Sequence, residues 1–189
     1  MIRAKRSLGQ NFLIDQNIIQ KIVNITEISN KEILEVGPGT GNLTSEILKK
    51  NPKKIYLVEK DNDLSNLLKD KFDKKITLFN DDILNFDEQS LSTNQIIVFG
   101  NLPYNISTEI LCKWIINLKS EFCWFNKLIL MFQKEVADRI TSDFNTRNYG
   151  RLAILTNWRL NVKKIFDIGP ECFSSRPKID SSVLYFEPK

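Results

Sequence analysis

The sequence predicts an α/β fold in which helices cover both faces of a mostly parallel sheet that carries an antiparallel terminal strand. Short apolar runs alternate with amphipathic stretches along the chain, as in successive right-handed βαβ units. The last two apolar stretches instead alternate apolar with polar residues, which indicates an antiparallel pair. No linker rich in glycine, proline or serine divides the sequence, so we expect the 189 residues to form one domain.

The predicted elements follow one another from strand to helix. Apolar runs predict parallel strands over 31–37, 53–61, 75–82, 95–101 and 127–135. Apolar residues at helical spacing predict helices over 42–50, 63–72, 106–118, 135–140 and 150–158, with Asn42 capping the first. The antiparallel pair is expected over 161–169 and 180–188, and the polar loop 87–94 is expected to be exposed. In such sheets, ligands bind beyond the carboxyl ends of the strands, where the strand order reverses.

The composition excludes several kinds of chemistry. The chain has no histidine, which rules out Ser-His-Asp and Cys-His nucleophile systems and histidine-ligated metals. Cys112, Cys123 and Cys172 share no metal-ligand spacing, so we expect reduced thiols and no metal. No apolar run approaches the roughly 20 residues of a membrane helix, and the basic start lacks the apolar core of a secretory signal. We therefore expect a cytoplasmic protein with no membrane partner.

A glycine-rich turn follows the first predicted strand. In LEVGPGTGNLT, Gly37, Gly39 and Gly41 allow positive φ and let the backbone approach a ligand closely. Glu59 ends the next predicted strand about 20 residues later, where an acidic residue usually binds the two hydroxyls of an adenosine ribose. These features alone would also suit a nicotinamide dinucleotide.

Two details favour a cationic ligand over a dinucleotide. The glycines follow G-x-G-x-G and not G-x-G-x-x-G, and Glu35 precedes the first of them by two positions. A helix N-terminus that binds pyrophosphate needs free backbone N–H groups and no nearby carboxylate. The sulfonium and amino group of S-adenosylmethionine are compatible with that acid. Asp82, at the tip of the third predicted strand, is then expected to accept a hydrogen bond from the adenine amino group.

The fourth predicted strand ends in a second motif, GNLPY. A nucleobase amino group is a weak nucleophile because its lone pair is delocalised into the ring, and hydrogen bonds accepted from it draw the nitrogen toward tetrahedral geometry. The Asn101 side-chain oxygen and the Leu102 carbonyl are suitable acceptors, and Pro103 fixes the backbone that aims them. Tyr104 can stack on an unpaired or flipped base, an interaction of about 1–3 kcal/mol. The motif therefore predicts a pocket for a base amino group that needs no histidine.

In this order along the chain, GQNFLID, EVGPGTGNLT, FGNLPYNIS, QKEVADR, YGRL and RPKIDSSV make the sequence closely resemble the ribosomal RNA adenine dimethyltransferases, and within them the small-subunit type. The resemblance covers the chain from Arg3 to Pro188. It implies a Rossmann-like class I methyltransferase sheet and methyl transfer from S-adenosylmethionine, with S-adenosylhomocysteine as product. The small-subunit type implies dimethylation of the 6-amino groups of two adjacent adenosines near the 3′ end of 16S ribosomal RNA, in ribosome biogenesis.

The resemblance also assigns roles to residues by position. It implies that the following residues bind the cofactor, the first two from an N-terminal arm (residues 1–14): Asn11, Leu13, Gly37, Gly39, Gly41, Glu59, Asp82 and Asn101. It implies that the target adenine is held by Asn101, Leu102, Pro103 and Tyr104. Phe173, in ECFSSRPKID, would close the other face of the adenine; the alternative is a core aromatic beside the last strand.

The sequence departs from the family pattern in two places. Ser174 and Ser175 follow Phe173 where the family often has prolines, so we expect a looser loop. The family usually continues into a small helical C-terminal domain that helps select RNA, and this domain is absent from the sequence, which ends at Lys189. Residues 1–189 are therefore expected to be a single catalytic domain.

The charge of the chain is compatible with a nucleic-acid partner. The 27 basic and 23 acidic residues give a net charge of +4. The basic residues expected to contact ribosomal RNA within the small subunit are Arg3, Lys5, Arg6, Arg139, Arg147 and Arg151. The alternative is that these charges only solvate exposed faces. We expect the protein to act as a monomer.

Two other functions remain open at this stage. The large-subunit adenine methyltransferases of the macrolide-resistance type have the same fold and chemistry, although NLPYNIS, QKEVADR and PKIDSSV favour the small-subunit type. The other possibility is a non-catalytic ribosome-assembly or transcription factor that kept the fold. The intact NLPY motif and Glu59 argue against it, because a scaffold has no use for that pair.

Overall fold

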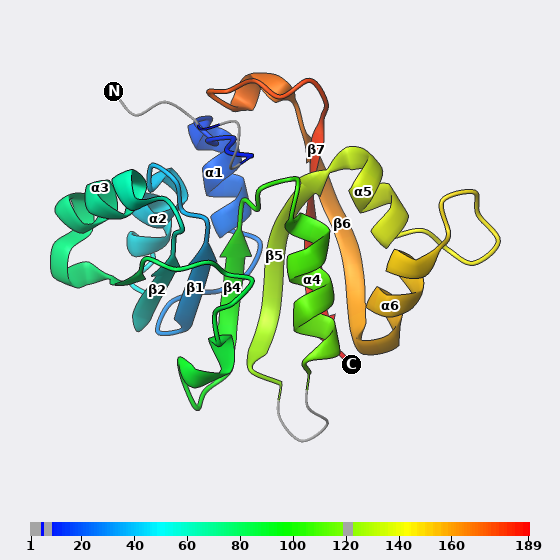
Figure 1. Cartoon of the computed structure of the whole chain (residues 1–189), viewed down its shortest axis with the longest axis horizontal. Helices are drawn as coiled ribbons and strands as arrows, with labels where there is room; N and C mark the ends of the chain where they lie inside the picture. The colour runs from blue at the N-terminus through cyan, green and yellow to red at the C-terminus, as the bar shows by residue number, and fades with distance from the viewer. Residues whose placement is uncertain (1–4, 6–8, 119–122) are drawn as a thin grey trace.

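The computed structural model describes residues 5, 9–118 and 123–189, and it contains a seven-stranded sheet with helices on both faces (Figure 1). The strands are β1 (Glu32–Val36), β2 (Lys54–Val58), β3 (Thr77–Phe79), β4 (Ile96–Gly100), β5 (Phe125–Gln133), β6 (Leu160–Ile168) and β7 (Ser181–Pro188). Their order is β3-β2-β1-β4-β5-β7-β6. The pairs among β1 to β5 are parallel, whereas β7 runs antiparallel to both β5 and β6. The predicted mostly parallel sheet and its antiparallel terminal strand are confirmed.

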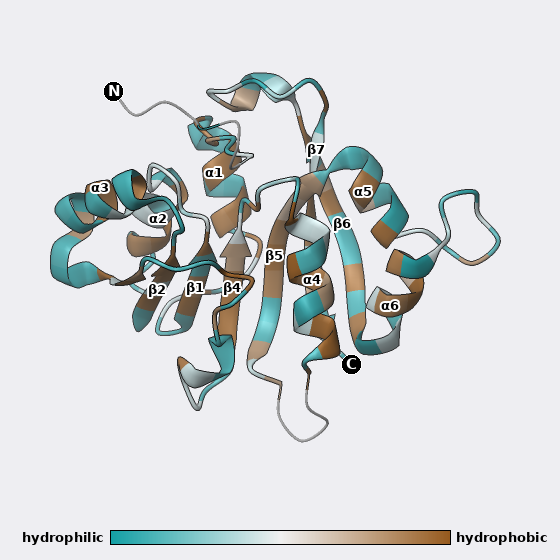
Figure 2. Cartoon of the chain, in the orientation of Figure 1, coloured by the Kyte–Doolittle hydropathy of each residue, from teal (hydrophilic) through white to brown (hydrophobic). Residues whose placement is uncertain are grey.

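Alternate residues of each central strand face opposite helical layers. One layer consists of α1 (Gln16–Val23), α2 (Asn42–Leu48) and α3 (Asn62–Phe72), and the other of α4 (Ser107–Ile116), α5 (Lys134–Ile140) and α6 (Arg151–Arg159). In β4, Ile97 and Phe99 pack with the first layer, and Ile96 and Val98 pack with the second. Figure 2 shows β4 largely hydrophobic between the helical layers, whereas α3 is mostly hydrophilic and β6 carries hydrophilic residues. Both faces of the central strands β1 and β4 are thus buried, as continuous apolar strands require, whereas β6 alternates with exposed residues.

One helix, α1, was not among the predicted elements. Asp15 caps it, because its side chain accepts a hydrogen bond from the Ile18 N–H at 3.0 Å. Ile19, Ile22 and Val23 are buried against the sheet. The Asp cap followed by isoleucines at helical spacing was the signal that could have identified this helix.

Two further expectations need correction. Asn42 is the first residue of α2 and Gly41 is the cap, so the Asn42 side chain is free to bind elsewhere. The loop 87–94 is not simply exposed: it contains a 3-10 turn, η3 (Glu88–Ser90), in which Glu88 is only 4% exposed. The Glu88 carboxylate accepts hydrogen bonds from Lys113 Nζ at 2.8 Å and Trp114 Nε1 at 2.6 Å. A buried carboxylate with two such partners anchors the loop to α4.

Within the described part of the chain, the three cysteines are free thiols, and no cluster of His, Cys, Asp or Glu is arranged to hold a metal ion. No helix among these residues is both long and apolar enough to cross a membrane. The strand order reverses between β1 and β4, which are direct neighbours and end at Val36 and Gly100. A ligand site is therefore expected beyond these two strand ends.

Candidate active site

The turn after β1 has the backbone conformation that its glycines predict. Gly37, Gly39 and Gly41 have φ values of 65°, 57° and 76°, a region that other residues rarely adopt. A Cβ atom on Gly39 would lie 2.9 Å from the Phe12 ring, whereas one on Gly37 would meet no atom closer than 3.6 Å. Gly39 is therefore required by close packing against the arm as well as by its φ. Gly37 and Gly39 line a cavity beyond the strand ends, whereas Gly41 does not line it, although its neighbours Thr40 and Asn42 do.

The arm forms one wall of this cavity. The Asn101 Nδ2 donates a hydrogen bond to the Asn11 carbonyl at 2.6 Å, and the Asn42 Nδ2 donates one to the Leu13 carbonyl at 2.9 Å. Two amides, one after β4 and one at the start of α2, thus hold the arm by its backbone. Asn11 and Leu13 both line the cavity, together with Phe12 between them. Asn42 was predicted only as a helix cap, and this function in holding the arm was missed.

Glu59 follows β2 and lines the cavity with its carboxylate already hydrogen-bonded to backbone. Its two oxygens accept from the Gly39 N–H at 3.2 Å and the Asp61 N–H at 2.9 Å. Burial raises the pKa of Glu59, and these N–H groups partly offset that effect. The bonds hold the carboxylate at the cavity wall, where its remaining lone pairs can accept from ligand hydroxyls.

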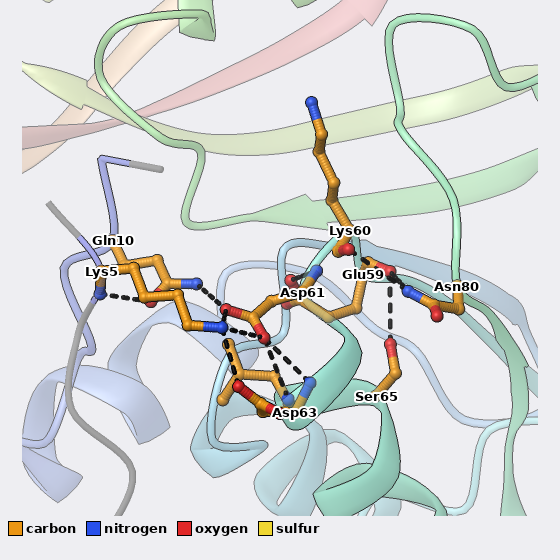
Figure 3. A network of polar contacts seen from close by, with 9 residues as sticks. Lys5, Gln10, Glu59, Lys60, Asp61, Asp63, Ser65 and Asn80 are labelled. Carbon is orange, nitrogen blue, oxygen red and sulfur yellow. Dashed lines mark hydrogen bonds and ion pairs between the residues drawn. The ribbon is translucent and has the colours of Figure 1, made fainter. Parts of the chain in front are cut away.

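A polar network ties the arm to the same region (Figure 3). The Asp61 carboxylate accepts from Lys5 Nζ at 3.0 Å and Gln10 Nε2 at 3.0 Å, and it caps α3 through the N–H groups of Asp63 and Leu64. Burial opposes ionisation of Asp61, but the bonds from Lys5 and Gln10 keep its pKa lowered. Neither Gln10 nor Asp61 was predicted as a site residue. Asp61 could have been recognised as an Asp that precedes a helix, whereas Gln10 gives no such signal.

Asp82 lines the cavity beyond β3 and forms an ion pair. Its carboxylate lies 2.8 Å from Lys60 Nζ and accepts from the Leu84 N–H at 3.0 Å. The bond from Lys60 lowers the pKa of Asp82, so this side chain is ionised. The structure thus places Asp82 in the cavity, but with a cation beside it that the sequence analysis did not include.

Glu35 is the most buried acid of the cavity. It is 1% exposed, and its carboxylate accepts from the Thr44 hydroxyl at 2.6 Å. Burial raises its pKa to about 7, against the Thr44 bond, and the negative charge of Glu59 adds to the rise. Among the described lining residues the ionisable side chains are Glu35, Glu59, Lys60, Asp81 and Asp82. This excess of acid is unsuited to pyrophosphate and fits a cationic ligand that carries hydroxyl and amino groups.

The segment after β4 lies at the rim of the cavity. Asn101 and Pro103 line it, and Leu102 is buried. Because the Asn101 Nδ2 donates to the Asn11 carbonyl, its Oδ1 remains as an acceptor. Tyr104 is partly buried, does not line the cavity, and shares a hydrogen bond with the Ser181 hydroxyl at 2.5 Å. Asn101 thus belongs to the cavity itself, and Tyr104 lies beyond its rim.

Phe173 is buried and does not line the cavity in this structure. It is 2% exposed, pairs with Leu13 in a β-bridge, and packs in the core with Ile168 and Val183. In this conformation it occupies the position of the core aromatic that was its alternative interpretation. Contact with a base would require movement of the segment that carries it.

The two serines after Phe173 do not leave the segment unattached. The Ser174 N–H donates to the Phe12 carbonyl at 2.9 Å, and the Ser175 hydroxyl donates to Asn11 Oδ1 at 2.7 Å. A proline at position 174 could not make the first of these bonds, because it has no N–H. The expected looseness is therefore corrected: hydrogen bonds to the arm hold this loop.

The predicted RNA-contacting residues differ in their surroundings. Arg139, Arg147 and Arg151 are exposed. Lys5 is engaged with Asp61 and with Asp63, the latter at 2.8 Å. Arg3 and Arg6 lie outside the described residues. Lys5 therefore stabilises the arm in this structure, and its availability to RNA is limited by that ion pair.

Comparison with known families decides the membership of the chain. The family model described as "Ribosomal RNA adenine dimethylase" matches residues 1–189. The chain belongs to the ribosomal RNA adenine dimethylase family. Membership makes it a methyltransferase and implies the use of S-adenosylmethionine, and the acidic cavity beyond the ends of β1 and β4 is chemically suited to that cofactor.

Curated relatives of this family are similar over the full chain. One, from Pelagibacter ubique (strain HTCC1062), is 66% identical over 188 residues, which cover 100% of this chain and 71% of the relative. Another, from Wolbachia sp. subsp. Drosophila simulans (strain wRi), is 43% identical over 192 residues and is covered to 69%. Both are named "Ribosomal RNA small subunit methyltransferase A".

Solved structures support the fold of this dimethylase. A dimethyladenosine transferase from Plasmodium falciparum superposes with a TM-score of 0.83 at 27% identity, covering 94% of this chain and 63% of that one. The 23S rRNA methyltransferase ErmE gives a TM-score of 0.80 at 24% identity, covering 95% and 70%, and this likeness shows the fold alone. The class I methyltransferase fold predicted from the sequence is confirmed.

Proposed function

We propose that this dimethylase transfers methyl groups to the 6-amino groups of two adjacent adenosines near the 3′ end of 16S ribosomal RNA. The observation that carries the proposal is the placement of Asn101, whose Nδ2 is held by the arm while its Oδ1 stays available at the cavity rim. This one residue can therefore face both a cofactor in the cavity and a base amino group outside it. The names of the full-length relatives support the small subunit as target.

The cofactor would be held by side chains that the structure brings together around the cavity. Glu59 would accept from the ribose hydroxyls, Asp82 from the adenine amino group, and Glu35 would face the positive end of the molecule. The sulfonium supplies the methyl group, and the electron pair of the broken C–S bond stays on sulfur in the thioether product. Asn11 and Leu13 would cover the ligand from the arm side.

The protein's part in the transfer is to prepare the amino group. Asn101 Oδ1 and the Leu102 carbonyl would accept its two N–H bonds, which localises the nitrogen lone pair for attack on the methyl carbon. The nitrogen becomes cationic as the C–N bond forms, and its proton can then leave to solvent. Tyr104 would stack on the base, which must be unpaired or flipped to arrive there. A second cycle on the same nitrogen gives the dimethyl product.

The remaining features of the proposal concern the whole protein. Residues 1–189 would act as one catalytic domain with a basic arm, as a monomer in the cytoplasm. Arg139, Arg147 and Arg151 would contact RNA phosphates, and each lost contact should lower the slope of log affinity against log salt by about one. If replacement of all three arginines with Gln leaves the slope unchanged, these residues do not contact the RNA.

The deciding experiment compares methyl transfer from labelled S-adenosylmethionine to unmethylated small and large ribosomal subunits, followed by nucleoside analysis. Dimethyladenosine in small-subunit RNA is the expected result. Label in large-subunit RNA would instead assign the chain to the macrolide-resistance type. No label with intact cofactor binding by calorimetry would contradict catalysis by this chain and favour the non-catalytic alternative.

A further inference from the structure

One hydrogen bond links the segment after β4 to a residue near the end of the sequence. The Tyr104 and Ser181 hydroxyls share a hydrogen bond at 2.5 Å, although the residues are 77 positions apart. Ser181 is the first residue of β7 and is 0% exposed. It pairs with Gln133 of β5 on one side and with Ile168 of β6 on the other. Its hydroxyl is therefore fixed by strands on both sides.

Tyr104 has no comparable support of its own. It lies in the turn between β4 and α4, outside both elements, and its side chain is partly exposed. Its backbone carbonyl accepts from the Ser107 hydroxyl at 3.3 Å, which positions the main chain but not the ring. The phenol oxygen is the one polar atom of the side chain, so its bond to Ser181 is a directional contact that can fix the orientation of the ring.

We propose that Ser181 is a positioning residue that sets the orientation of Tyr104, and through it the orientation of the target base. The inference rests on the proposed function, because it needs Tyr104 to be the residue that stacks on the adenine. A ring held by its outer end presents one fixed face, whereas a ring released from Ser181 can rotate about its side-chain bonds. The base would then lose the alignment between its amino nitrogen and the methyl group.

The neighbouring serine provides a matched control. Ser182 is also 0% exposed, but its hydroxyl donates to Asp167 Oδ1 at 2.7 Å and makes no bond to Tyr104. Ser181→Ala and Ser182→Ala therefore each delete one buried hydroxyl and one hydrogen bond in the same strand. A merely structural role predicts equal effects of the two substitutions, and a positioning role predicts that only Ser181→Ala slows the reaction.

The experiment measures methyl transfer to unmethylated small subunits at saturating S-adenosylmethionine. Ser181→Ala and Tyr104→Phe should each lower kcat about 5- to 10-fold, the loss expected for one positioning hydrogen bond. The double variant should be no slower than the slower single variant, because both changes remove the same bond. Ser182→Ala should stay within about twofold of the unaltered chain, and the Kd for S-adenosylmethionine should be the same in all four variants.

A second measurement does not depend on turnover. An RNA hairpin with 2-aminopurine at the target position reports stacking through quenching of its fluorescence, and Ser181→Ala should weaken the quenching while Ser182→Ala should not. If Ser181→Ala fails to fold, Tyr104→Phe tests the same bond from the surface side. Equal kcat values for Ser181→Ala and Ser182→Ala, or additive losses in the double variant, would overturn this inference alone. No methyl transfer by the unaltered chain would overturn it together with the proposed function.

Discussion

The cofactor half of the site is preformed in this structure, whereas the acceptor half is not. The cofactor half, meaning Glu35, residues 37–41, Glu59 and Asp82, is held by hydrogen bonds among buried or partly buried groups. In the acceptor half, meaning residues 101–104 and Phe173, the tyrosine is partly exposed and the phenylalanine lies in the core. A small ligand needs a preformed cavity, whereas an RNA substrate brings surface of its own that completes the site.

The largest effect is expected at Asn101, the residue that the two halves share. Asn101→Ala removes both the acceptor for the amino group and the donor that holds the arm through Asn11. We expect methyl transfer to fall by about 10²–10³-fold, as when a single oriented polar group is removed from other active sites. Single-turnover transfer to small subunits measures it. The control is Asn126→Ala, which changes an exposed amide at the end of β5 away from the cavity. A loss below about tenfold for Asn101→Ala would contradict the idea that the two halves share this residue.

The second effect is a pH dependence that Glu35, in the cofactor half, contributes to stability. The pKa of Glu35 is about 7 in the folded protein and 4.5 in an unfolded chain, so the folded state binds the extra proton between these values. The contribution of Glu35 to the free energy of unfolding is therefore largest below about pH 4.5 and decreases as the pH rises through about 7, by up to about 3 kcal/mol. Glu35→Gln should remove this decrease. Urea denaturation of both proteins at pH 5 and pH 8 tests it, and parallel pH profiles would contradict it.

Glu59→Gln should weaken cofactor binding without affecting RNA binding. Loss of the charged acceptor should raise the Kd for S-adenosylmethionine by about 10- to 100-fold, measured by calorimetry. Glu46→Gln is the matched control, because Glu46 is an equally buried acid of α2 that pairs with Lys49 and does not line the cavity. If RNA affinity falls as much as cofactor affinity, the division into two halves is wrong.

The smallest effect is expected at the bond between Ser175 and the arm. Ser175→Ala removes the bond to Asn11 Oδ1 at an exposed position, so the free energy of unfolding should fall by only about 0.5 kcal/mol. Chemical denaturation measures it, with Ser142→Ala as a serine that does not contact the arm. A decrease in the free energy of unfolding as large as that for a buried hydrogen bond would mean that Ser175 stabilises the arm more than its exposed position implies.

The two halves also differ in how well the sequence predicted them. The glycine turn and Glu59 were predictable because local backbone geometry and strand ends determine their positions. For Phe173 the sequence left two positions open, since its bridge with Leu13 depends on packing between distant segments. The same holds for the Lys60–Asp82 pair and for Glu88, whose polar segment looked like a solvated loop. Hydrophobic periodicity predicts helices and strands, but it does not predict which side chains from distant segments contact one another.

The bonds between the arm and the segment after β6 have a consequence for synthesis on the ribosome. Asn11 and Ser175 are 164 positions apart, so the arm emerges early and its partner much later. A nascent chain that ends before residue 172 would contain the glycine turn and Glu59 but would lack the backbone partners of Ile14 and Phe12. Contacts this distant in sequence form late in folding. We therefore expect the nascent chain to become able to bind the cofactor in one late step, after most of the chain has been translated.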